Sequence, residues 1–162
     1  MRILGIDPGT ATIGFGLIDV QGRSYKIVDF GHISTSKKFS SAHRLNEIAH
    51  DLNALCQKWN PTVCAVEELF FSKNVKTAMQ VAQARGVILQ TLNHAGYPIY
   101  EYNPLHIKVA LTGDGKAIKS QVQKMVAILL KMDSIPKPDD AADALAVAIC
   151  HAHTPIHHTT TQ

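Results

Sequence analysis

Hydrophobic and polar positions follow a strand-like spacing in the first third of the chain. Residues 2–7 form a short apolar run, and residues 12–20 and 25–33 interleave apolar residues with small or polar ones. Gln21-Gly22 separates the last two segments and supplies a tight turn. Strand-like segments joined by tight turns are typical of antiparallel pairing. The first third therefore predicts a three-stranded antiparallel meander.

From residue 40 onward, apolar residues recur every three or four positions, which is the spacing of one helix face. Two short apolar segments, residues 62–67 and 97–102, interrupt this pattern and indicate two further strands. Strands joined by crossover helices pair in parallel, so we expect an α/β fold with a mixed five-stranded sheet flanked by helices. The expected helices cover about residues 40–59, 75–94, 104–111 and 117–132, and a last helix starts near residue 139 or 140 and runs to about residue 153.

Length and composition place bounds on the class of protein. The chain has 162 residues, of which 46% are hydrophobic and 18% are charged, as in an ordinary globular domain. No apolar run approaches the roughly 20 residues that span a bilayer, and the N-terminus lacks the long apolar stretch of a signal peptide. We expect a cytoplasmic protein with a single domain over residues 1–153 and a flexible tail over residues 154–162.

Acidic residues stand at positions where a carboxylate is costly. Asp7 and Glu67 each end an apolar strand-like run, and Asp143 lies one turn inside an apolar helix that begins near Asp140. An ionised carboxylate beside a core is unfavourable unless it is paired or binds a metal. Neighbouring strands lie about 4.8 Å apart, so the first two side chains can reach one site. The pattern predicts a site for a hard divalent cation, which suits phosphodiester chemistry.

Spacing alone leaves two of these ligand positions open. Glu68 follows Glu67, and adjacent strand residues face opposite sides, so only one of the two can face the site. Asp139 and Asp140 both share a helix face with Asp143, being four and three residues before it. An acid at this position can instead cap the helix or stabilise its dipole, and this is the role that we expect for Asp139.

Positive charge is concentrated in one part of the chain. The net charge is only +3 with neutral histidines, but residues 108–137 contain six lysines and two aspartates. This local surplus of positive charge suits phosphate binding, although a solvated helix face would show the same pattern.

Five short motifs occur in order along the chain, and they are Ile6-Asp7-Pro8-Gly9-Thr10, Ala65-Val66-Glu67-Glu68-Leu69-Phe70, Gln83-Ala84-Arg85-Gly86, Lys119-Ser120-Gln121-Val122 and Asp140-Ala141-Ala142-Asp143-Ala144-Leu145-Ala146. Together they resemble the motifs of the RuvC family of bacterial Holliday-junction resolvases, which have a ribonuclease H-like fold. The resemblance runs over residues 1 to about 153. Each motif is weak alone, but five in sequence at family spacing are specific.

The resemblance implies a homodimeric endonuclease that nicks two strands of like polarity across a four-way DNA junction in recombination and repair. The products would carry 5′-phosphate and 3′-hydroxyl ends. The cofactor would be Mg²⁺, with Mn²⁺ as a possible substitute and two ions per active site. The branch-migration motor RuvA and RuvB would be a partner. The family motifs select Asp7, Glu67, Asp140 and Asp143 as catalytic ligands, although some similar enzymes carry histidine at the position of Asp140.

The resemblance also implies DNA contacts. Lys108 and Lys119 match basic positions near the scissile phosphate, and Phe70 matches an aromatic residue that stacks on a base near the junction centre. Surface lysines and a core phenylalanine are the ordinary alternatives. The helix over residues 75–94 has small and apolar residues on more than one face and is the expected dimer seam. The residues expected to contact DNA are Phe70, Lys73, Lys76, Arg85, Lys108 and Lys119.

Three other functions share parts of this pattern. The Asp7-Pro8-Gly9-Thr10 turn, followed by Gly14 and Gly16, also resembles the phosphate-binding hairpin of actin-like ATPases, but these need two lobes and the length suffices for one. A related nuclease that processes ribosomal RNA precursors would share the fold and the metal site but should lack the lysine and aromatic pattern. A DNA-binding module without cleavage would not need all four carboxylates.

Overall fold

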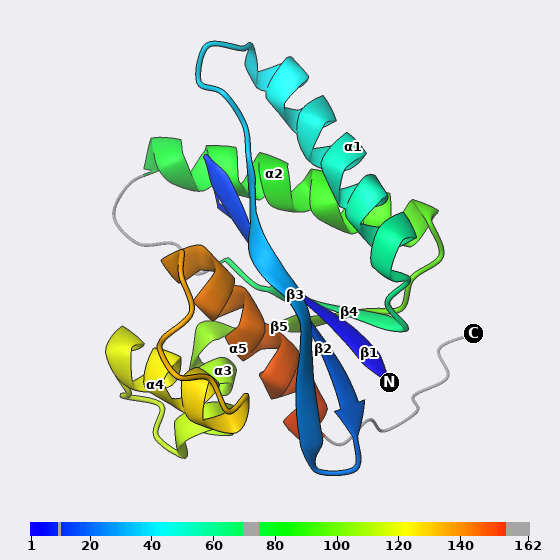
Figure 1. Ribbon diagram of the computed structural model, residues 1–162. Coiled ribbons are helices and arrows are strands. Elements are labelled where there is room, and N and C mark those ends of the chain that lie inside the picture. Colours follow the sequence, from blue (N-terminus) through cyan, green and yellow to red (C-terminus); the bar gives the residue numbers. More distant parts are fainter. Residues whose placement is uncertain (10, 70–74, 155–162) are drawn as a thin grey trace, which may run out of the picture.

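A mixed five-stranded sheet forms the centre of the computed structural model, which describes residues 1–9, 11–69 and 75–154 (Figure 1). Its strands are β1 (Arg2–Asp7), β2 (Thr12–Gln21), β3 (Ser24–Ser34), β4 (Val63–Glu67) and β5 (Ile99–Tyr102). They lie in the order β3-β2-β1-β4-β5. β2 pairs antiparallel with both β1 and β3, whereas β4 pairs parallel with both β1 and β5. The expected meander and the expected mixed sheet are both confirmed.

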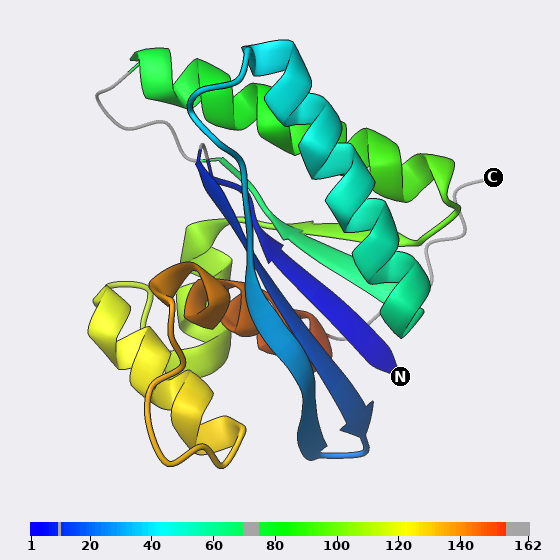
Figure 2. The same ribbon diagram turned by 45° about the horizontal axis from the view of Figure 1, so that its top comes forward.

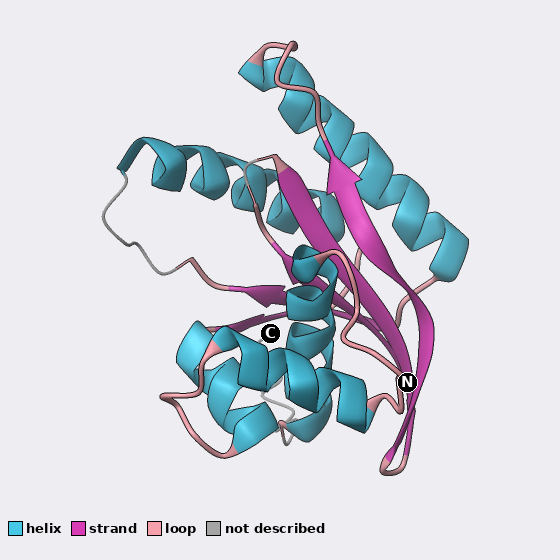
Figure 3. Ribbon diagram, turned by 60° about the vertical axis from the view of Figure 1, so that its left-hand side comes forward, coloured by secondary structure: helices cyan, strands magenta, loops and turns pink. Residues whose placement is uncertain are grey.

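Helices cover both faces of the sheet (Figure 2, Figure 3). The helices are α1 (Ser41–Trp59), α2 (Val75–His94), α3 (Pro104–Thr112), α4 (Lys119–Leu129) and α5 (Asp139–His153). α1 and α2 lie on one face, while α3, α4 and α5 lie on the other, with α5 directly against β1 and β2. None of the described helices is both long enough and apolar enough to cross a membrane.

Two hydrophobic cores result from the alternation of side chains along the central strand β1. Ile3 is fully buried in the core that contains Leu145 of α5. Leu4, the next residue, is fully buried in the opposite core with Leu52 of α1 and Ile88 of α2. The sheet is therefore apolar on both faces, and polar side chains gather where its strands end.

Glycines in the sheet let α5 pack close to β1 and β2. A Cβ atom on Gly5 would lie 2.1 Å from the backbone oxygen of Ala144, and one on Gly16 would lie 2.7 Å from the side chain of an α5 leucine. These distances exclude a side chain at both strand positions. The close packing brings Asp140 and Asp143 to the end of β1, so the glycines help to build the acidic site.

Polar caps set the ends of the helices, as their sequence signals predict. The side chain of Ser40 accepts a hydrogen bond from the backbone N–H of His43 at 3.3 Å, and Asn60 ends α1 in the left-handed conformation with φ 45°. The side chain of Asn103 accepts from the N–H of His106 at 2.8 Å, and α3 starts at the following proline.

The C-terminal end of α5 is also capped. The backbone N–H and the hydroxyl of Thr154 both donate to the carbonyl oxygen of Cys150, at 3.1 and 2.9 Å. Thr154 was expected to begin the tail, and the rest of that tail lies outside the described residues.

Candidate active site

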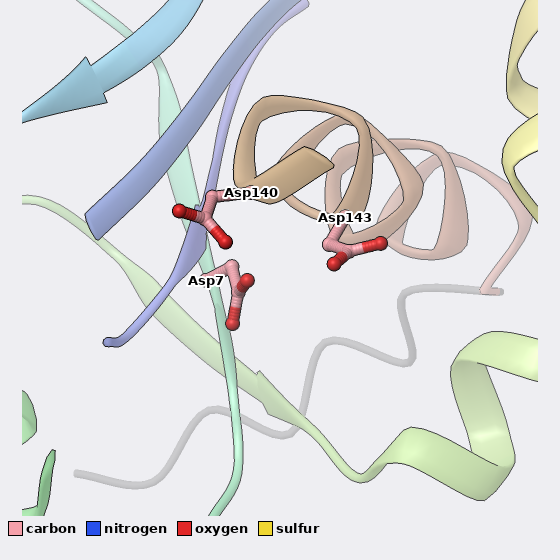
Figure 4. A group of neighbouring side chains, drawn as sticks. All are labelled: Asp7, Asp140 and Asp143. Atoms are coloured by element: carbon pink, nitrogen blue, oxygen red, sulfur yellow. The ribbon is translucent and has the colours of Figure 1, made fainter. Parts of the chain in front are cut away.

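Three aspartates from two separate segments meet beside the end of β1 (Figure 4). Asp7 is the last residue of β1, and Asp140 and Asp143 lie about one turn apart near the start of α5. One carboxylate oxygen from each of the three side chains lies within 4.8 Å of the other two. Carboxylate oxygens at this separation are suitable ligands for a hard divalent cation.

Glu67 lies beside Asp7 on the neighbouring strand, outside the set of three aspartates whose oxygens lie within 4.8 Å of one another. β1 and β4 pair in parallel with Ile6 opposite Val66, so Asp7 and Glu67 end their strands side by side. Their carboxyl groups share a hydrogen bond, and both line a cavity of about 330 Å³. Glu68 instead lines a separate hollow beside α2. Of the two glutamates that spacing left open, Glu67 is the one that the strand register turns toward Asp7.

Burial and mutual repulsion raise the pKa values of Asp7, Glu67 and Asp143, so these three acids are hard to ionise. Desolvation, followed by the charges of Asp143 and Asp140, raises the pKa of Asp7 to about 6. Desolvation and the neighbouring Asp7 raise the pKa of Glu67 to about 8, and burial also raises the pKa of Asp143. A cation among these oxygens would relieve both the desolvation and the repulsion.

Two lysines on the α3 and α4 side complete the cavity. The Nζ atom of Lys119, the first residue of α4, lies 2.6 Å from a carboxylate oxygen of Asp143. Lys108 of α3 lines the same cavity. The structure thus places Lys119 against Asp143 and Lys108 in the same cavity, as would be needed for a lysine to contact a phosphate held at the acidic site.

Asp139 does not cap α5, so the capping part of this prediction is wrong, but Asp139 lies in the first turn of the helix, where its charge favours the helix dipole as expected. The helix begins at Asp139 itself, with Pro138 in the N-cap position, and among the described residues no side chain makes an N-cap hydrogen bond there. The exposed carboxylate of Asp139 pairs with Nζ of Lys137 at 2.6 Å, and the hydrogen bond from that lysine lowers the pKa of Asp139. The carboxylate of Asp139 is therefore paired with Lys137 and does not belong to the cluster of Asp7, Asp140 and Asp143.

The remaining predicted DNA contacts lie away from the cavity or outside the described residues. Arg85, in the middle of α2, forms an ion pair with Glu101 of β5, and its Nε donates to the backbone oxygen of Glu67 at 3.3 Å. Its guanidinium therefore joins α2 to the ends of two strands. Phe70 and Lys73 lie outside the described residues, as does the side chain of Lys76 in the first turn of α2.

One residue near the site had no signal in the sequence. The hydroxyl of Thr12, at the start of β2, donates to a carboxylate oxygen of Asp140 at 2.5 Å. The two residues are 128 positions apart, and a threonine at the start of a strand is ordinary. Only the packing of α5 against β2 reveals the contact.

Comparison with known proteins adds an independent line of information. The family model described as "Crossover junction endodeoxyribonuclease RuvC" matches residues 3–151. Curated relatives with this description include those of Halothermothrix orenii, 53% identical with 95% of this chain and 93% of the relative covered, and Heliobacterium modesticaldum, 54% identical with 95% of each covered.

Solved structures give the same result. Thermus thermophilus RuvC superposes with a TM-score of 0.87 at 34% identity, covering 94% of both chains. A structure described as T. thermophilus RuvC in complex with Holliday junction substrate gives 0.86 at 32% identity, again covering 94% of both. The yeast mitochondrial Holliday junction resolvase, at 16% identity and a TM-score of 0.69, supports the ribonuclease H-like fold alone.

Proposed function

Because the chain belongs to the RuvC family of crossover junction endodeoxyribonucleases, we propose that it resolves four-way DNA junctions by metal-dependent hydrolysis of phosphodiester bonds. Two symmetric nicks would leave 5′-phosphate and 3′-hydroxyl ends in recombination and repair. The observation that carries the proposal is the cluster of Asp7, Asp140 and Asp143 in a chain that the family model matches over residues 3–151. Family membership favours this function over cleavage of ribosomal RNA precursors and over an ATPase lobe.

We assign the metal-binding role to Asp7, Glu67, Asp140 and Asp143. All four offer carboxylate oxygens, and burial raises the pKa values of Asp7 and Glu67, which supports a site where a cation would balance the negative charge. This donor set fits Mg²⁺, with Mn²⁺ as a possible substitute. Two bound ions would supply Lewis-acid activation of water and stabilisation of the leaving oxygen. Asp7 lies between Glu67 and the α5 aspartates, so we propose that it is the ligand shared by both ions.

We propose that Lys108 and Lys119 bind the scissile phosphate and balance the charge that develops on it. Their support is the shared cavity with Asp7, Glu67 and Asp143. The ion pair with Asp143 holds the Lys119 ammonium beside the carboxylates, so this group can meet a phosphate oxygen that reaches the acidic site. Each lysine adds a charge-assisted hydrogen-bond donor for a phosphate oxygen.

The other proposed DNA contacts rest on the family motifs. Phe70 would stack on a base near the junction centre, and Lys73 and Lys76 would contact the DNA backbone. We keep Arg85 in this group as a proposal, although its pairing with Glu101 favours an internal role. A single nuclease domain over residues 1–153 would carry all of these contacts.

The proposed assembly also follows from family membership. A homodimer built through α2 would place two active sites about a two-fold axis, which matches the symmetry of a four-way junction. RuvA and RuvB would supply branch migration, and the cytoplasm is the expected compartment for an enzyme acting on these DNA intermediates.

The proposal is tested with purified protein and four substrates: a labelled four-way junction, a linear duplex, a structured RNA and ATP. We expect paired, symmetric nicks in the junction with Mg²⁺ and none with EDTA. Asp143→Asn, which keeps the shape of the side chain, should bind the junction without cutting it. Preferential cleavage of RNA would contradict the proposal and favour a nuclease that processes ribosomal RNA precursors. ATP hydrolysis without nicking would contradict it and favour an actin-like ATPase.

A further inference from the structure

Asp140 is held from outside its own helix by the first residue of β2. The Thr12 hydroxyl donates to Oδ2 of Asp140 at 2.5 Å, across 128 residues of sequence. Figure 4 shows that one oxygen of Asp140 points toward Asp7 and the other points away from it. One oxygen of this carboxylate is thus occupied by a neutral donor, which leaves the other for the acidic cluster.

The backbone of Asp140 is also fitted against the same strand. Gly14 lies opposite Asp7 in the β1–β2 ladder, and a Cβ atom on Gly14 would lie 1.9 Å from the backbone oxygen of Asp140. Thr12 and Gly14 are two residues apart and therefore face the same side of the sheet. Thr12 donates a hydrogen bond to the side chain of Asp140, and Gly14 leaves the space in which the backbone of Asp140 approaches β2.

The first turn of α5 has little else to fix Asp140. Its N-cap position is Pro138, and among the described residues no side chain caps this helix. Asp139, the neighbouring acid, is paired with Lys137 on the exposed side. The orientation of the Asp140 carboxylate therefore depends on β2.

We propose that Thr12 is a positioning residue for the metal centre. Its hydroxyl fixes the rotamer of Asp140 and takes up one carboxylate oxygen, so that Asp140 can offer only the other oxygen to a divalent ion. This inference rests on the proposed function, since it takes Asp140 as a metal ligand. Outer-shell partners of this kind typically change metal affinity or activity by about 10–100-fold when they are removed.

The test compares Thr12→Val, which keeps the shape and loses the hydroxyl, with Thr12→Ser, which keeps the hydroxyl. Mn²⁺ binding to the full-length protein is measured by isothermal titration calorimetry without DNA. Thr12→Val is expected to raise the Kd for Mn²⁺ about 10–100-fold, in line with other outer-shell partners. Thr12→Ser should bind Mn²⁺ as the wild type does. A role in folding alone would lower the melting temperature without changing the Mn²⁺ affinity of the folded protein.

Asp140→Asn separates failure of this inference from failure of the proposed ligand set. If Asp140→Asn binds Mn²⁺ as tightly as the wild type, Asp140 is no ligand and the ligand set is wrong. If Asp140→Asn weakens binding but Thr12→Val does not, the ligand set stands and the inference is overturned. The double variant Thr12→Val/Asp140→Asn should bind Mn²⁺ no more weakly than Asp140→Asn alone. If the losses in Mn²⁺ affinity from the two substitutions add, Thr12 does not act through Asp140. If Thr12→Val folds poorly, Thr12→Ala provides the same comparison. A Mn²⁺ affinity of Thr12→Ala equal to that of the wild type would overturn the inference.

Discussion

Asp7→Asn is expected to stabilise the metal-free protein at neutral pH while abolishing junction cleavage. Folding raises the pKa of Asp7 from 3.8 to about 6, mainly through burial and then through the charges of Asp143 and Asp140. The ionised carboxylate is therefore less favourable in the folded state than in the unfolded chain. Asparagine removes this charge, and its amide can still hydrogen-bond with Glu67.

The size of the effect follows from the pKa shift. A shift of roughly two units at about 1.36 kcal/mol each gives about 3 kcal/mol as an upper limit, because a buried amide must also lose its hydration. In a domain of this size, that corresponds to a melting temperature higher by up to about 10 °C. The penalty on wild-type Asp7 is absent below about pH 4, grows as the pH rises to about 6, and is constant above that.

The assay is thermal unfolding at pH 4 and pH 8 in EDTA, repeated at pH 8 with Mg²⁺. Asp7→Asn should melt higher than the wild type at pH 8 in EDTA and close to it at pH 4. Saturating Mg²⁺ should stabilise the wild type, by about 2.7 kcal/mol at one hundred times Kd, and stabilise the variant less.

Asp19→Asn is the matched control for this assay. Two hydrogen bonds from Arg2, at 2.9 and 2.8 Å, lower the pKa of Asp19, so its ionised form favours folding. Asp19→Asn should therefore lower stability at pH 8, by an amount that shrinks as the pH falls through the pKa range of Asp19. A melting temperature of Asp7→Asn below that of the wild type at pH 8 in EDTA would refute the reasoning, since it would make Asp7 a carboxylate that the fold needs.

Three further predictions concern the surroundings of the site. Lys119→Ala should lower the cleavage rate and reduce the slope of log affinity against log salt by about one, the change expected for one lost phosphate contact; an unchanged slope in filter-binding titrations removes Lys119 from the DNA interface. Arg85→Ala and Glu101→Gln should both lower the melting temperature, because the two side chains pair with each other. If Arg85 also contacts the DNA backbone as proposed, Arg85→Ala alone reduces the slope of log affinity against log salt, and an unchanged slope removes this arginine from the DNA contacts. Gly5→Ala should cost more than about 3 kcal/mol in urea unfolding, because its Cβ would lie 2.1 Å from the oxygen of Ala144, and a loss below about 1 kcal/mol would show that α5 can move away freely.

Local patterns in the sequence were sufficient to predict the helices and strands of the fold. The turn at Gln21-Gly22, the cap at Ser40 and the Asn103-Pro104 start each act within a few residues, so they can be recognised without knowing the fold. The parallel pairing of β1 with β4 followed from the intervening helix, and it correctly indicated that Asp7 and Glu67 end side by side.

Long-range geometry decided what the sequence left open. The orientation of Glu67 rather than Glu68 depends on the register of β4 against β1, which spacing does not encode. The role of Asp139 depended on the start of α5, which lies one residue earlier than a capping aspartate requires. The hydrogen bond from Thr12 to Asp140 requires β2 and α5 to pack closely, and no local sequence pattern around either residue predicts it.

The central claim is that Asp7, Glu67, Asp140 and Asp143 hold the divalent ions of the nuclease. Its most direct test is a crystal structure of the protein with Mn²⁺, with the ions located by anomalous scattering. We predict two peaks about 3.5–4 Å apart. Oxygens of these four carboxylates should lie about 2.1 Å from the ions, and Asp7 should contact both. Mn²⁺ bound elsewhere, in crystals of a protein that cleaves four-way junctions with Mn²⁺ in solution, would contradict this assignment.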